Sequence, residues 1–122
     1  MVASKAQEVD PSLPPVRALI EAYQEDASAL RRFHPWRMSM ARHQRMGTLI
    51  EQFSHRLNDI GFAPLSQEER IDYLLFQNQL KFDERRLTQE RQRHAEIQPW
   101  IRFGDGILAL AEARQRVETI DP

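Results

Sequence analysis

The 122-residue chain contains no cysteine, which excludes disulfides, thiolate metal sites and a cysteine nucleophile. It has four glycines, and the one close pair, Gly104 and Gly106, is too short to form a glycine-rich loop of the kind that holds phosphates. No apolar run approaches the roughly 18 residues that a membrane span requires. Residues 1–10 also lack the hydrophobic segment of a signal peptide. We therefore expect no membrane partner, while the compartment, exported or cytoplasmic, stays open.

Charge of neither sign dominates, since 17 basic and 18 acidic residues give a net charge of -1. No overall field would therefore attract nucleic acid or an acidic membrane. Residues 81–94 mix arginines with acids, which is typical of a solvated, salt-bridged helix face. We expect no nucleic-acid partner. The alternative is a nucleic-acid binder that uses Arg85, Arg86, Arg91 and Arg93, and its affinity would fall steeply with salt.

Prolines, glycines and the spacing of apolar residues divide the chain into four expected helices. Residues 1–13 are polar and are expected to form a flexible lead-in, and Pro15 suits the first turn of a helix. His34 precedes a proline and should end that helix, while Gly61 should cap the next one in the left-handed conformation. The expected helices cover residues 15 to about 32, 39 or 40 to 60, 66–97 and about 106–118.

The predicted fold class is therefore all-α, with one helix of about 30 residues. The second and third helices are joined by a short link, so they should form an antiparallel hairpin. The third begins with Ser66 and Glu69, the pattern of a reciprocal capping box. Neither proline nor glycine interrupts it before Pro99.

The start of this long helix is apolar in nearly every direction, and such a helix must be enclosed on several sides. A chain of this size is small for that purpose, so we expect a fragment of a larger helical protein, with an exposed apolar patch. Trp100 and Phe103 follow in a turn of residues 99–106 and are expected to fold inward. The candidate interaction surface consists of Ile71, Tyr73, Leu74, Leu75, Phe76, Trp100 and Phe103.

Histidines offer the first candidates for chemistry. His55 and His94 each follow a glutamate by four residues, so Glu51/His55 and Glu90/His94 share helix faces, and His43 could add a third metal ligand. The helical zinc pattern His-Glu-x-x-His is absent, however. We expect surface ion pairs instead, with His94 at the edge of the packed face. No metal or catalytic residue is assigned.

The remaining polar groups favour structural roles as well. Adjacent carboxylates at residues 68–69 and 83–84 point about 100° apart on a helix and do not converge on a substrate. Residues 31–37 mix aromatic and cationic side chains that could stack on bases or on a peptide. We expect instead a corner between helices, in which Phe33 and Trp36 plug the core and the arginines stay in water.

A family resemblance adds to this reading. The run LSQEERIDYLLFQNQL at residues 65–80, followed by Arg85, Arg86 and Leu87, resembles the N-terminal part of the bacterial "domain of unknown function 885" (DUF885) family. Residues 107–122, which end in EARQRVETIDP, are also similar to that family. The resemblance covers roughly residues 15–122, and its motifs are helix patterns without a catalytic signature.

The resemblance implies a parent several times longer and mostly helical, of the zincin metallopeptidase type, with a His-Glu-x-x-His helix far toward its C-terminus. No residue here matches that motif, so zinc is expected only in the missing part of the parent. Residues 14–122 would form a non-catalytic N-terminal segment that supports or covers the cleft, with the rest of the parent as partner. Asp121 followed by Pro122 reads as the start of another helix.

The alternative function comes from a different class. The chain could be a stand-alone helical interaction module that dimerises, or binds a partner, through its exposed apolar face.

Overall fold

The computed structural model describes residues 12–116. These residues are all-α, without a strand, which confirms the predicted fold class. Expectations for most of the lead-in, for the end of the fourth helix and for the final Asp-Pro pair fall outside the described residues. The elements are α1 (Pro15–Phe33), α2 (Met40–Ile60), α3 (Gln67–Ile97), the short 3₁₀ helix η1 (Gln98–Trp100) and α4 (Gly104–Gln115).

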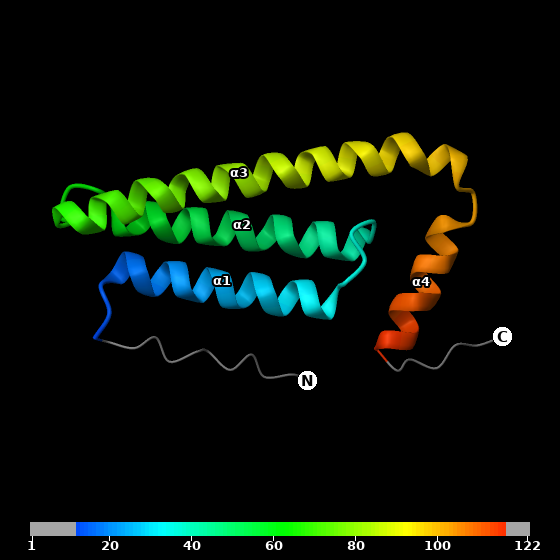
Figure 1. The fold of residues 1–122 in the computed structure, drawn as a ribbon, viewed down its shortest axis with the longest axis horizontal. Coiled ribbons are helices and arrows are strands. Elements are labelled where there is room, and N and C mark those ends of the chain that lie inside the picture. The colour runs from blue at the N-terminus through cyan, green and yellow to red at the C-terminus, as the bar shows by residue number, and fades with distance from the viewer. Residues whose placement is uncertain (1–11, 117–122) are drawn as a thin grey trace.

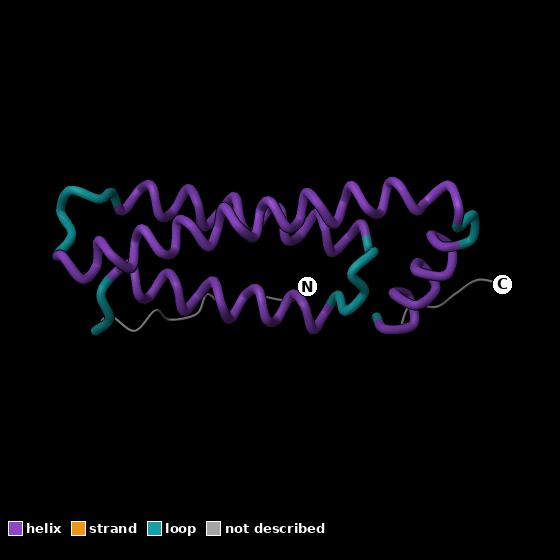
Figure 2. The backbone as a smooth tube through the Cα atoms, turned by 45° about the horizontal axis from the view of Figure 1, so that its top comes forward, coloured by secondary structure: helices purple, strands orange, loops and turns teal. Residues whose placement is uncertain are grey.

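Three of the helices form a bundle, and the fourth stands across its end. Helices α1, α2 and α3 lie side by side, with α2 antiparallel to both neighbours, as Figure 1 and Figure 2 show. The predicted hairpin of α2 and α3 is therefore present. Helix α4 turns back from the far end of α3 and runs crosswise, toward the end of α1 (Figure 1).

Local signals fix the helix ends largely as the sequence predicts. The Ser66 hydroxyl accepts a hydrogen bond from the Glu69 amide at 3.3 Å, and the Ser66 amide donates to the Glu69 carboxylate at 3.1 Å. Ser39 caps α2 by accepting from the Arg42 amide at 3.3 Å. Gly61 ends α2 with φ 74° but ψ 161°. The positive φ is as expected, but the ψ value lies outside the left-handed helical region.

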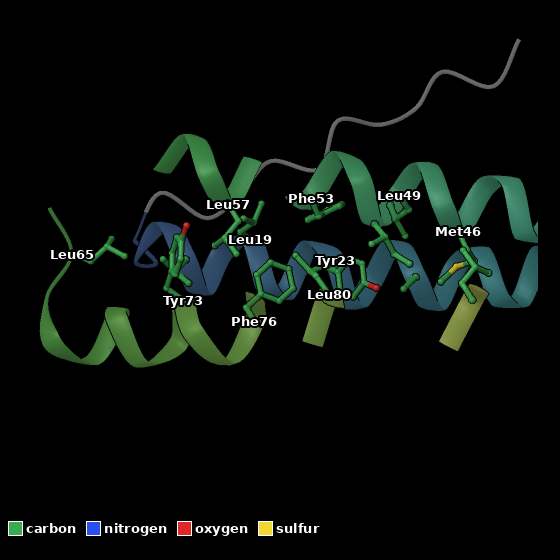
Figure 3. Packing of buried hydrophobic residues seen from close by; sticks show 14 residues of the cluster. Leu19, Tyr23, Met46, Leu49, Phe53, Leu57, Leu65, Tyr73, Phe76 and Leu80 are labelled. Atoms are coloured by element: carbon green, nitrogen blue, oxygen red, sulfur yellow. The ribbon is translucent and has the colours of Figure 1, made fainter. Parts of the chain in front are cut away.

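Tyr23 occupies the centre of the core, where side chains of all three bundle helices meet (Figure 3). Its ring meets Phe53 and Phe76 edge to face, with centroid distances of 5.3 and 5.5 Å. Its hydroxyl donates to Asp83 at 2.7 Å. Burial and this contact raise the pKa of Tyr23 well above its ordinary value. The remaining core residues are Val16, Leu19, Ala27, Met46, Leu49, Ile50, Leu57, Leu65, Tyr73, Leu80 and Leu87.

Helix α3 is longer than the two helices that cover it. At 1.5 Å per residue, its 31 residues extend about 46 Å, against about 32 Å for the 21 residues of α2. Its last turns therefore project past the core. Only η1 and a short turn separate it from α4, which begins at Gly104, two residues before the predicted start.

Candidate interaction surface

The structure separates the predicted surface residues of α3 into two groups. Tyr73 and Phe76 are core residues, with 8% and 3% of their surface exposed, so their assignment to an outer surface is wrong. Ile71, Leu74 and Leu75 are exposed, as predicted. The cause is the stripe of buried positions at residues 73, 76, 80, 87 and 94, whose spacing of three, four and seven keeps one side of α3 against α1 and α2.

The exposed residues form an apolar stripe along the opposite side of α3, which we call the α3 outer face. It consists of Ile71, Leu74, Leu75 and Phe82, all exposed. Positions 71, 75 and 82 are four and seven residues apart, so they follow one face of the helix. Beside it, an open groove of about 480 Å³ lies between α1 and α3, with Ile20 and Leu75 among its lining residues.

Helix α4 and the turn before it carry the second exposed apolar surface, which we call the α4 face. Trp100 and Phe103 are 87% and 79% exposed, so the expectation that they fold inward is wrong. Ile107 and Leu110 on α4 are exposed too, and none of the residues of α4 is buried. Because α3 projects beyond α1 and α2, no bundle layer lies where these aromatic rings could pack.

Mostly polar contacts hold α4 to the bundle. The Gln98 amide donates to Asp105 at 2.7 Å, and His94 Nε2 lies 3.9 Å from the same carboxylate. Ser39 donates to Glu112, which links α4 to the cap of α2. Between α4 and the bundle lies an open apolar pocket of about 290 Å³, so the contact is not close-packed. Its lining includes Met38, Ile97, Ile101 and Leu108.

Three histidines lie in the interior near this end of the bundle. His43 is fully buried, and neither ring nitrogen meets a hydrogen-bond partner among the described residues. Its ring centroid is 6.1 Å from that of His94. His94 was expected at the edge of the packed face, and it is buried. Burial lowers the pKa of His43. Burial also lowers the pKa of His34.

The predicted glutamate–histidine ion pairs are wrong. Glu90 pairs with Arg86 at 3.5 Å, while His94 lies nearest Asp105, and in the described part of the chain His55 forms no ion pair. One turn of spacing permits such pairs, but Glu90 and His94 each lie closer to another partner. Among residues 12–116, no three histidine or acidic side chains are grouped as ligands for one metal ion.

The corner between α1 and α2 also differs from expectation. Phe33 and Trp36 are exposed, so they do not plug the core, whereas His34 and Ser39 are buried there. The signal was present in the sequence, because positions 16, 19, 23, 27 and 30 of α1 continue at 34 with helical spacing. Phe33 lies about 100° away from this stripe.

The described residues thus present two exposed apolar surfaces, the α3 outer face and the α4 face. In the same residues, no helix is both long and apolar enough to cross a membrane. Comparison with protein-family models, with curated proteins and with solved structures gave no match to this chain.

Proposed function

We propose that this chain is a non-catalytic helical segment of a larger protein resembling the zinc metallopeptidases of the DUF885 family. In that role its apolar faces dock on the rest of the parent, and the segment supports or covers the substrate cleft. The substrate belongs to the parent, and zinc would be held there, outside this chain. The observation that carries the proposal is the α4 face, where a whole helix and its leading turn expose large apolar side chains.

The free energy gained by burying these exposed apolar side chains favours binding to a partner. Burying one Phe, Leu or Ile side chain stabilises a complex by about 1.5–3 kcal/mol before the costs of association are counted. Trp100, Phe103, Ile107 and Leu110 are all more than half exposed. Large contiguous apolar surfaces on monomeric soluble proteins commonly mark binding sites, so exposed side chains of this size favour a role in binding.

Sequencing the gene beyond codon 122 tests directly whether the chain belongs to a longer parent protein. We expect the reading frame to continue past codon 122 and to encode a His-Glu-x-x-His helix. In the full-length protein, removal of this segment should then reduce peptidase activity, while the isolated 122-residue chain should show none. A stop codon directly after Pro122, or zinc-dependent peptide hydrolysis by the isolated chain, would contradict the proposal.

A second candidate is a stand-alone module that dimerises through an apolar face, and the α3 outer face favours it. Analytical ultracentrifugation distinguishes the surfaces. If the α4 face mediates self-association, the double variant Trp100→Ser/Phe103→Ser should be monomeric, whereas Ile71→Ser/Leu75→Ser should associate as the wild-type 122-residue chain does. The reverse pattern assigns the contact to the α3 outer face. A wild-type monomer that binds no hydrophobic dye would oppose both candidates.

A further inference from the structure

A small pocket lined by arginines lies where the end of α1 and the start of α2 meet the middle of α3. Its volume is about 120 Å³. Three different elements and the α1–α2 loop contribute to it, so it exists only in the folded chain. Its charged lining residues are Arg31, Arg37, Arg42, Arg86, Asp83 and Glu90.

The charges around this arginine pocket do not balance. Four guanidinium groups face two carboxylates, which leaves an excess of two positive charges. Asp83 is already engaged, since it accepts from the Tyr23 hydroxyl at 2.7 Å and from the Gln79 amide at 3.0 Å. Glu90 pairs with Arg86. Among the described residues, Arg31, Arg37 and Arg42 therefore form no ion pair with a carboxylate.

Arg42 is the most firmly positioned of the four. It is half-buried, and its Nη1 donates to the backbone carbonyls of His34 and Pro35, each at 3.3 Å. Burial lowers the pKa of Arg42, and the charges of the other three arginines lower it further, while the charge of Glu90 raises it. This unfavourable environment would be relieved by a bound anion.

The floor of the pocket strengthens any such interaction. Met46, Ile50 and Leu87 line it, and all three belong to the buried core. Charges beside an apolar surface are less screened than charges surrounded by water, so attraction to an anion is stronger there. Arg31, Arg37 and Arg86 are exposed at the rim and can turn toward a ligand without leaving water.

We infer that the arginine pocket binds a single phosphate group, either free phosphate or the phosphate of a small monoester. Guanidinium groups match phosphate oxygens in paired hydrogen bonds. A phosphate monoester carries about -1.5 to -2 charges near neutral pH, which matches the excess of two, whereas one carboxylate would leave half of it uncompensated. Pockets for whole drug-sized ligands measure about 300–1,000 Å³, so a pocket of 120 Å³ suits one small group.

This site is independent of the proposed docking function, because it lies on neither apolar face. Titration of the 122-residue chain with sodium phosphate at constant ionic strength tests it, followed by ¹H–¹⁵N NMR of backbone amides and arginine Nε–H groups. We expect saturable shifts at Arg31, Arg37, Arg42 and Arg86. The variants Arg37→Gln and Arg42→Gln should each bind phosphate about tenfold more weakly, because each loses a charge-assisted hydrogen bond.

Controls separate a built site from general charge. Arg93→Gln makes the same change of charge at an exposed position of α3 outside the pocket. This variant should bind phosphate as tightly as the wild-type chain does. Arg42→Lys keeps the charge but loses the planar fork, so it should bind with intermediate strength. If Arg42 variants unfold, Arg37→Gln still provides the test, because the Arg37 side chain is exposed and forms no ion pair within residues 12–116.

Two further titrations identify the source of the phosphate. O-phosphoserine that binds more tightly than inorganic phosphate would indicate a site for a phosphorylated molecule, and the reverse order would indicate free phosphate. Both results support phosphate chemistry. Shifts that do not saturate, that sodium chloride reproduces, that acetate produces at lower concentration, or that Arg93→Gln weakens equally would overturn the inference.

Discussion

The three-helix bundle and the α4 end of the molecule are built in opposite ways. In the bundle, α1, α2 and α3 bury apolar stripes against one another around Tyr23, whose hydroxyl donates to Asp83. Helix α4 buries none of its own residues and is attached by hydrogen bonds to Gln98, Ser39 and the end of α1. Because hydrogen bonds contribute little net free energy in water, we expect α4 to be held less firmly than the three helices of the bundle.

Neighbouring residues of α3 give the strongest test of this contrast. Phe76→Ala should lower the free energy of unfolding by about 3–5 kcal/mol, because Phe76 fills the core beside Tyr23. Leu75→Ala, one position away on the exposed side, should change it by no more than about 0.5 kcal/mol. Urea denaturation followed by circular dichroism measures both. Equal losses would mean that the two sides of α3 are covered alike.

Acidification should destabilise the bundle end where the histidines are buried. The pKa of His43 and that of His34 are lowered by burial, so below their unfolded value of about 6.5 the unfolded chain takes up more protons than the folded one. Stability is therefore fully present above that pH and falls as the pH drops through the folded pKa values. Urea midpoints measured from pH 8 to pH 5 should decrease.

A pair of variants assigns this effect to the interior. His43→Leu replaces the unpartnered imidazole by an apolar side chain and should flatten the dependence of the urea midpoint on pH. His55→Gln, at an exposed position of α2, should leave that dependence unchanged. If both variants show the same dependence of the urea midpoint on pH as the wild-type chain, the loss of stability at low pH arises elsewhere, for instance at His34.

The capping box provides a test of intermediate size. Ser66→Ala removes the acceptor of the Glu69 amide and should lower the free energy of unfolding by about 1 kcal/mol. Ser66→Asp keeps an acceptor at the helix start and should restore most of that loss. Equilibrium urea denaturation or a chevron analysis measures both variants. If Ser66→Ala leaves the free energy of unfolding unchanged, the long helix is held by packing alone.

The sequence was most informative where a local rule decides the structure. Pro15, Ser66 and Gly61 mark helix ends through caps and turns that depend on a few neighbouring residues. The burial of the apolar residues at positions 71–76 was harder to predict. Tyr73 and Leu74 are both apolar neighbours in the sequence, and they differ in burial because only Tyr73 lies on the side of α3 that faces α1 and α2. That choice is made by tertiary packing.

The parts that could not be predicted depend on contacts between distant segments. Trp100 and Phe103 were expected inside because they are large and apolar, but the length of α3 carries them past the bundle. The arginine pocket is another example, since the sequence grouped Arg86 with its neighbours along α3. The structure instead sets it opposite Arg31 and Arg42, 55 and 44 residues away in the chain.

The smallest effect concerns the attachment of α4 itself. Asp105 accepts from Gln98 and lies near His94, and exposed contacts of this type contribute up to about 1 kcal/mol together. Asp105→Ala should therefore leave the urea midpoint almost unchanged and speed amide exchange in α4 by roughly 2- to 5-fold, while exchange in α2 stays constant. Glu84→Ala, on an exposed position of α3 with the same change of charge, should affect neither helix. Uniform acceleration across all four helices would show that α4 and the bundle open as one unit, and would remove the distinction between them.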